Sequence, residues 1–151
     1  MNEFQTPNPT ELDMKSVFQI AERAADDFGY SEHNNIYQTI TDLGGQVFAK
    51  DFWAEGSSEG GSLVVRAEDD FTIFVPNDTS LERDKFTIAH ELGHYVLHYL
   101  WPRYVKGEPE FMLRASRYGS DRSEWEANWF AAAFLMPEKK FNKKVALVLQ
   151  L

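Results

Sequence analysis

The sequence predicts an α+β domain in which a small sheet packs against helices. Apolar residues recur at helical spacing up to about residue 43, strand-like runs follow from residue 46 to residue 75, and helical spacing returns from about residue 80. The chain has 151 residues, of which 43% are hydrophobic. This length supports one hydrophobic core and is too short for two comfortable ones, so we expect a single domain over residues 1–151.

Two helices are predicted in the N-terminal part of the chain. Residues 1–9 contain two prolines and two asparagines, and we expect them to be disordered or loosely draped. A first helix is expected from Thr10 to Gly29, because one apolar stripe runs between them and glycine is a natural helix end. A shorter second helix is expected from about Asn34 to Gly44.

Three strands are predicted next, and they are expected to form a mostly antiparallel sheet. Residues 46–53, 62–67 and 71–75 are short runs rich in Val, Phe, Ile and Thr. The glycines and serines of residues 55–61 predict a flexible turn, and the acidic residues 68–70 predict a tighter hairpin.

The following helix carries the most informative motif of the chain. It is expected from about residue 80 to residue 100, with a capping box at Thr79–Glu82 and Pro102 preventing its continuation. Its centre reads His90-Glu91-Leu-Gly-His94. Residues four apart lie on one helix face, so the two histidines can present two ring nitrogens to one metal ion. Glu91 is then the expected catalytic residue, a base that takes a proton from a water molecule. The alternative is two core histidines that happen to be four residues apart.

The C-terminal part is predicted to contain a long irregular segment and two helices. Residues 101–120 are expected to be a loop, because prolines and glycines interrupt them. A helix is expected over residues 122–136, where Met136-Pro137 ends it, and a last helix over residues 137–151.

A metal site built on His90 and His94 needs a third protein ligand. The chain has no cysteine, which leaves histidine and carboxylates. His98 lies about 12 Å of helix rise beyond His90, so we expect it to pack beside the site instead of binding the ion. Glu124 and Glu126 both stand where a glutamate can cap a helix start. If Asp121 caps the helix, Glu124 is occupied and Glu126 is free; this argument favours Glu126 and leaves Glu124 open.

These motifs resemble a known family. Residues 86–94 with His98, then Glu126-Ala-Asn128-Trp-Phe130-Ala131 and Leu135-Met136-Pro137, are similar to the ImmA/IrrE metallopeptidases, peptidase family M78, over roughly residues 60–137. The resemblance implies a zincin-like fold, with a small sheet beside an HExxH helix and a second ligand-bearing helix. It also implies that Glu126 is the third metal ligand.

The same resemblance predicts the reaction and the partner. It implies a zinc-dependent endopeptidase that cleaves a helix-turn-helix (XRE-type) repressor or antitoxin encoded nearby and so relieves repression. The ligand types favour Zn²⁺, and such a site also binds Mn²⁺. The alternative is a non-catalytic regulatory or toxin-like module that binds or sequesters a transcription regulator.

Charge and hydropathy restrict the other partners. A formal net charge of -9 argues against direct contact with a long stretch of nucleic acid, whose phosphates require a basic surface. The sequence has neither a signal-peptide pattern at its start nor an apolar run long enough for a membrane span, and we expect a cytoplasmic protein.

Overall fold

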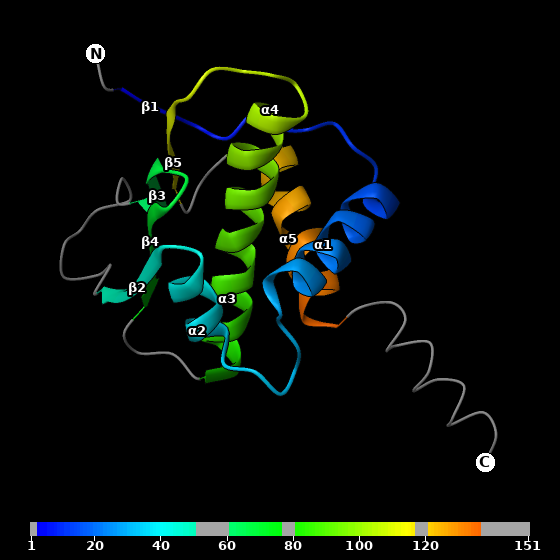
Figure 1. Cartoon of the computed structure of the whole chain (residues 1–151), viewed down its shortest axis with the longest axis vertical. Coiled ribbons are helices and arrows are strands. Elements are labelled where there is room, and N and C mark those ends of the chain that lie inside the picture. The colour runs from blue at the N-terminus through cyan, green and yellow to red at the C-terminus, as the bar shows by residue number, and fades with distance from the viewer. Residues whose placement is uncertain (1–2, 51–60, 77–80, 117–120, 137–151) are drawn as a thin grey trace.

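The computed structural model describes residues 3–50, 61–76, 81–116 and 121–136. A helical rod stands between a mixed β-sheet on one side and two further helices on the other (Figure 1). The α+β prediction is therefore confirmed.

The elements follow one another in an order that alternates between the sheet and the helices. In chain order they are β1 (Phe4–Gln5), α1 (Met14–Phe28), α2 (Ile36–Asp42), β2 (Gly45–Lys50), β3 (Gly61–Ala67), β4 (Asp70–Pro76), α3 (Leu81–His94), η1 (Tyr95–Leu100), α4 (Trp101–Tyr104), β5 (Met112–Ser116) and α5 (Asp121–Leu135).

The sheet has five strands in the order β1-β5-β3-β4-β2, so the prediction of a three-stranded, mostly antiparallel sheet is wrong. Strand β3 pairs antiparallel with β4 and β5, whereas β2 pairs parallel with β4 and β1 pairs parallel with β5. Sequence reasoning found β2, β3 and β4 because each lies in a short run rich in Val, Phe, Ile and Thr. It missed β5, which lies among prolines and glycines, although Leu113 and Ala115 are buried in the core.

Strand β1 contradicts the prediction of disorder for the described residues 3–9. Phe4 and Gln5 pair with Met112 and Leu113 at the sheet edge, and the Arg114 guanidinium lies 4.6 Å from the centre of the Phe4 ring. Two residues have no strand signal of their own, so this strand exists because β5 provides its hydrogen-bonding partner.

Helix α1 begins later than predicted and ends where predicted. Its N-cap is Asp13, whose side chain accepts a hydrogen bond from the Ser16 backbone N–H at 2.8 Å. Thr10 therefore lies outside the helix. Gly29 ends the helix with a φ of 68°, a left-handed conformation that glycine adopts without steric cost.

The predicted metal helix continues beyond Pro102, as one rod from α3 through η1 to the end of α4. A proline in a regular α-helix loses a hydrogen bond and its ring clashes with the carbonyl four residues earlier. Here η1 is a π-helical segment, in which the Trp101 N–H bonds to the Val96 carbonyl five residues back. The wider turn relieves the clash, so the prediction that Pro102 ends the helix is wrong.

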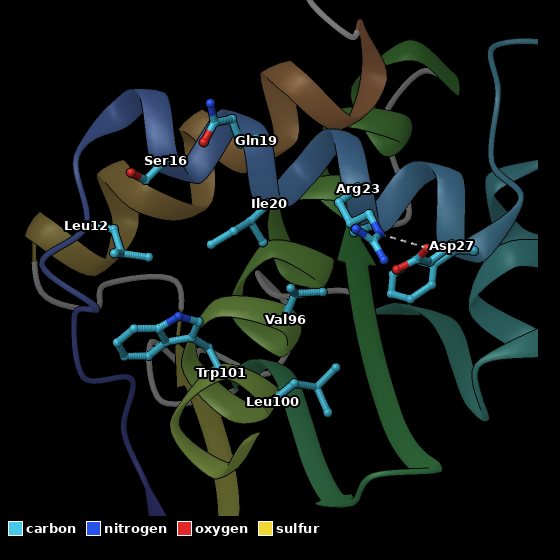
Figure 2. Close-up of a pocket in the computed structure, with 11 residues that line it drawn as sticks. Leu12, Ser16, Gln19, Ile20, Arg23, Asp27, Val96, Leu100 and Trp101 are labelled. Atoms are coloured by element: carbon cyan, nitrogen blue, oxygen red, sulfur yellow. Dashed lines mark hydrogen bonds and ion pairs between the residues drawn. The ribbon is translucent and has the colours of Figure 1, made fainter. Parts of the chain in front are cut away.

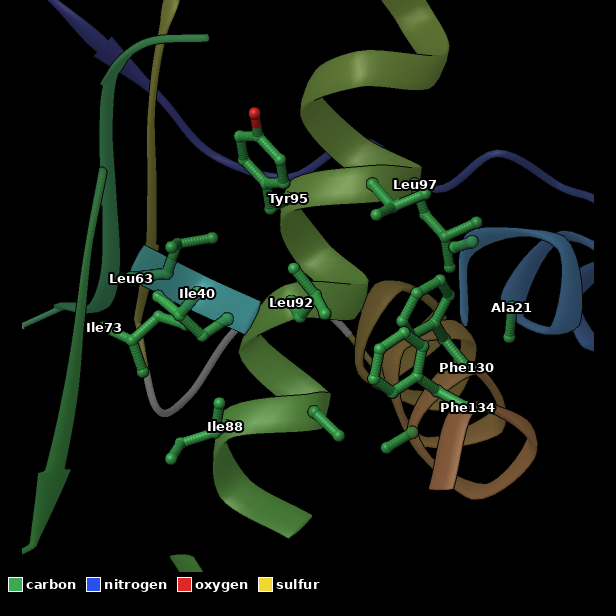
Figure 3. Close-up of a cluster of buried hydrophobic side chains, with 14 of the residues drawn as sticks. Ala21, Ile40, Leu63, Ile73, Ile88, Leu92, Tyr95, Leu97, Phe130 and Phe134 are labelled. Atoms are coloured by element: carbon green, nitrogen blue, oxygen red, sulfur yellow. The ribbon is translucent and has the colours of Figure 1, made fainter. Parts of the chain in front are cut away.

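The rod is buried on two sides, which fixes its orientation. Figure 3 shows one hydrophobic core around the rod, with a first part towards the sheet and a second part towards helices α1 and α5. The first contains Ile88, Ile40, Leu63 and Ile73, and the second contains Leu97, Phe130, Phe134 and Ala21. Both parts of the core are shielded from solvent, and the polar residues Glu91 and His94 of α3 are buried as well.

A groove of about 490 Å³ lies between α1 and the C-terminal part of the rod. Its wall is mainly apolar, with Ile20 from α1 facing Val96, Leu100 and Trp101 from η1 and α4 (Figure 2). None of the predicted site residues lines this groove.

Other predictions fall outside the described residues. These are most of the turn at residues 55–61, the start of the capping box at residues 79 and 80, and the helix at residues 137–151. Among the described residues, we find no helix with both the length and the apolar character that a membrane span requires.

Candidate metal centre

The HExxH residues lie on α3, as predicted, in its last two turns. His90, Glu91 and His94 offer ligand atoms that lie within 4.8 Å of one another. His94 and Glu91 are buried, and His90 is partly exposed. This group has the residue types and the proximity that a metal ion needs.

Helix α5 brings a second carboxylate to the two histidines, and it belongs to Glu124. Oε2 of Glu124 lies 2.8 Å from Nε2 of His90, and Oε1 lies 3.2 Å from Nε2 of His94. The two imidazoles and one carboxylate thus converge.

Glu126, the glutamate predicted as the third metal ligand, has its carboxylate among other partners. Its Oε1 accepts a hydrogen bond from the Thr10 backbone N–H at 2.9 Å and lies 2.9 Å from Nε2 of His98. Its Oε2 accepts hydrogen bonds from the Glu11 backbone N–H and from Nε of Arg122. Residues two apart on a helix do not face each other, so Glu124 and Glu126 cannot both face His90 and His94.

The opposite nitrogens of both histidines are also engaged. Nδ1 of His90 lies 2.8 Å from Oδ1 of Asn128, and Nδ1 of His94 lies 2.9 Å from Nδ1 of His98. An amide oxygen only accepts hydrogen bonds, so Nδ1 of His90 carries the proton. The other ring nitrogen, Nε2 of His90, faces Glu124, and it is this nitrogen that would bind a metal ion.

The surroundings of His94 and Glu124 favour the neutral imidazole and the ionised carboxylate, which are the forms that bind metal ions. Burial raises the pKa of Glu124, but hydrogen bonds from His90 and His94 outweigh it and hold the pKa at about 2. Burial lowers the pKa of His94 to about 4, although the hydrogen bond that His94 donates to Glu124 acts in the opposite direction. Near neutral pH, Glu124 is therefore ionised and His94 is neutral, the forms that bind metals.

His90 shifts in the other direction. Burial lowers its pKa, but the hydrogen bond to Glu124 and the charges of Glu91 and Glu124 outweigh burial and raise the pKa above its ordinary value. The two histidines differ because His94 is fully enclosed and lies close to both His90 and His98. A cation that binds here displaces the proton of His90.

Helices α3 and α5 approach each other closely at Gly93, between the two histidines of the motif. A Cβ atom added to Gly93 would lie 3.1 Å from Cβ of Phe130 and 3.2 Å from the Ala127 carbonyl oxygen. These distances are tighter than ordinary van der Waals contact. The glycine thus allows α5 to bring Glu124 within reach of α3.

We expect Gly93→Val to lower the free energy of unfolding by about 2–3 kcal/mol, because overpacking a core contact costs this much. It should also weaken metal binding, because it pushes α5 away from the histidines. Urea denaturation and a titration with a divalent metal ion measure the two effects. Ala132→Val, at an exposed position of α5, is the control and should cost only about 0.5 kcal/mol. Equal effects of the two variants would show that the close approach at Gly93 is unimportant.

Comparisons with known proteins agree with the motifs. Residues 46–147 match the family described as Peptidase_M78, IrrE N-terminal-like domain. Metallopeptidase ImmA of Bacillus subtilis (strain 168) is 25% identical over 115 residues, which cover 76% of this chain and 62% of that protein. The chain thus spans less than two thirds of the length of this curated relative. No solved structure matches the chain significantly.

Proposed function

This chain belongs to the M78 family of peptidases, and we propose that it is a zinc-dependent metallopeptidase whose metal is held by His90, His94 and Glu124. One observation carries the proposal: Nε2 of both histidines faces the same carboxylate, while their Nδ1 atoms are engaged on the other side. Two imidazoles and one carboxylate are a common ligand set of catalytic zinc. The name of the relative, a metallopeptidase, supports the same reaction.

The donor set suits zinc, and Glu91 provides the proton transfer. A zinc ion held there would act as a Lewis acid that polarises the scissile carbonyl and makes water more acidic. The Glu91 carboxylate accepts the proton of the water that attacks the carbonyl carbon. It then delivers this proton to the amide nitrogen as the carbon–nitrogen bond breaks. The histidine and carboxylate ligands also accept manganese, so the metal identity needs a direct test.

The proposed substrate is a helix-turn-helix (XRE-type) repressor or antitoxin encoded nearby. The proposed activity is that of an endopeptidase, which hydrolyses a peptide bond inside the substrate chain. The family supports this assignment, and the net charge of -9 suits a basic, DNA-binding partner. We place the reaction in the cytoplasm, where such a regulator works.

Intact-mass analysis tests the proposal directly. The purified protein and its Glu91→Gln variant are mixed with the regulator encoded beside the gene, with zinc and separately with manganese. Fragments from the wild-type reaction alone establish a metallopeptidase, and their masses locate the cleaved bond. A stable complex without fragments for either protein would instead favour a non-catalytic module that sequesters the regulator.

A further inference from the structure

A buried pair, His98 on η1 and Glu126 on α5, lies directly behind the ligand histidine His94. Both members are almost completely shielded from solvent, with exposures of 1% and 0%. Nδ1 of His98 lies 2.9 Å from Nδ1 of His94, and Nε2 of His98 lies 2.9 Å from Oε1 of Glu126. The proposed function uses neither residue.

We propose that His98 and Glu126 are positioning residues that orient His94 for metal binding, and that residues 10–12 anchor them. This inference rests on the proposed function, because it assigns His94 to the metal.

The direction of the hydrogen bonds follows from the chemistry of the acceptors. The Glu126 carboxylate accepts hydrogen bonds only, so Nε2 of His98 must donate to it. Nδ1 of His98 is then free to accept, and Nδ1 of His94 can donate to it. With a metal ion bound, His94 would present its lone pair on Nε2, the nitrogen that faces Glu124. One buried carboxylate thereby selects the tautomer of a histidine that it does not touch.

The helix geometry places His98 where this contact is made. The π-helical segment η1 begins directly after His94 and contains His98. The two imidazole rings are 5.0 Å apart between centroids and are tilted by 45°. Single π-helical turns inside α-helices occur frequently at functional sites.

The carboxylate of Glu126 is itself held by donors from two directions. The backbone N–H groups of Thr10 and Glu11 and the Nε–H of Arg122 donate to it, in addition to His98. Burial raises the pKa of Glu126, but these donors outweigh burial and hold the pKa at about 2. These four hydrogen bonds fix the position of the carboxylate that faces His98.

The segment before α1 is shaped around this carboxylate. Arg122 also donates from Nη2 to the Leu12 carbonyl at 2.5 Å, which joins the segment to α5 a second time. Glu11 adopts a φ of 63°, a left-handed conformation that is unfavourable for a residue other than glycine. This conformation is held while the Thr10 and Glu11 N–H groups both point at Glu126.

The test compares zinc affinity in variants of this pair, by competition with a chelating fluorophore. His98→Leu removes the acceptor for His94, and Glu126→Gln disturbs the acceptor for His98. Each should raise the zinc dissociation constant by about 10- to 100-fold, the range found for groups that act through a ligand. His98→Asn retains an acceptor and should lose less affinity than His98→Leu.

Controls separate positioning from general damage to the fold. His33→Leu makes the same substitution at a histidine whose side chain is 87% exposed, and it should leave zinc affinity unchanged. Ile40→Val weakens the core on α2, away from the metal centre, and should lower stability without changing zinc affinity.

A nitrogen-15 NMR spectrum of the zinc-bound protein shows which ring nitrogen of each histidine carries the proton. A purely structural role of His98 predicts no particular protonation pattern. We expect His98 to be protonated at Nε2 and a scalar coupling to connect Nδ1 of His94 with Nδ1 of His98. Protonation of His98 at Nδ1, or unchanged zinc affinity in both His98→Leu and Glu126→Gln, would overturn the inference. Failure of the wild-type protein to bind zinc would instead overturn the proposed function, so the two failures are distinguishable.

Discussion

Glu91→Gln is expected to reduce peptide cleavage by roughly 10³-fold, within the 10²- to 10⁴-fold range typical of lost general acid–base catalysis. The amide is close in size to the carboxylate, so the substitution preserves packing next to His90. It cannot accept the proton of the attacking water, because a carboxamide is a very weak base. Zinc affinity should remain similar to that of the wild-type protein, because Glu91 is not one of the proposed ligands.

Cleavage of the cognate regulator, followed by intact mass over time, measures this effect, and a chelator competition measures retained zinc. Glu82→Gln is the matched control, because it makes the same change at an exposed position of the same helix. It should cleave at the wild-type rate. A Glu91→Gln variant as active as wild type would remove Glu91 from the proton-transfer step.

Glu124→Gln is expected to raise the zinc dissociation constant by more than about 100-fold, which exceeds the loss expected for a residue that acts through a ligand. Glu124 has an oxygen against Nε2 of each ligand histidine. Its replacement removes the anionic ligand and the negative charge that favours a divalent cation. Peptide cleavage should fall in parallel, because the metal is lost at ordinary zinc concentrations.

The comparison with Glu126→Gln decides between the two glutamates. Cobalt bound in place of zinc reports its coordination in the visible absorption spectrum. We expect Glu124→Gln to change the band positions, and Glu126→Gln to preserve them while cobalt binds more weakly. The reverse pattern would return the third-ligand role to Glu126, the residue that the family resemblance selected. Urea denaturation of both variants verifies that each is folded under the conditions in which the cobalt spectra are compared.

The HExxH helix was predictable because the information is local. Helical periodicity places residues four apart on one face, so His90 and His94 converge wherever this helix forms. Apolar residues on the other faces, such as Ile88 and Leu92, bury the helix between the sheet and α5. The three strands β2, β3 and β4 were predictable for the same reason, because each lies in a short run rich in β-branched and aromatic residues.

Strands β1 and β5 were not predictable, because their stability comes from partners distant in the sequence. Phe4 pairs with Met112, more than a hundred residues away. Neither strand has a long apolar run, and each is held by backbone hydrogen bonds that composition does not reveal. The continuation of the rod through Pro102 depends similarly on the π-helical segment before it.

The choice between Glu124 and Glu126 also depends on contacts between residues that are distant in the sequence. Sequence reasoning assumed that one glutamate would cap its own helix, and the cap was expected to occupy Glu124. The actual competitor is the Thr10–Glu11 backbone, whose N–H groups bind Glu126 across 116 and 115 residues of sequence. No local pattern predicts this contact.

By itself, the sequence determined the residue types of the site, the spacing of His90, Glu91 and His94, and the family, because spacing along one helix sets which side chains share a face. Only the tertiary structure decided which carboxylate completes the cluster. Glu124 and Glu126 are two residues apart and point in different directions, and the packing of α5 on α3 at Gly93 sets which of them faces the histidines.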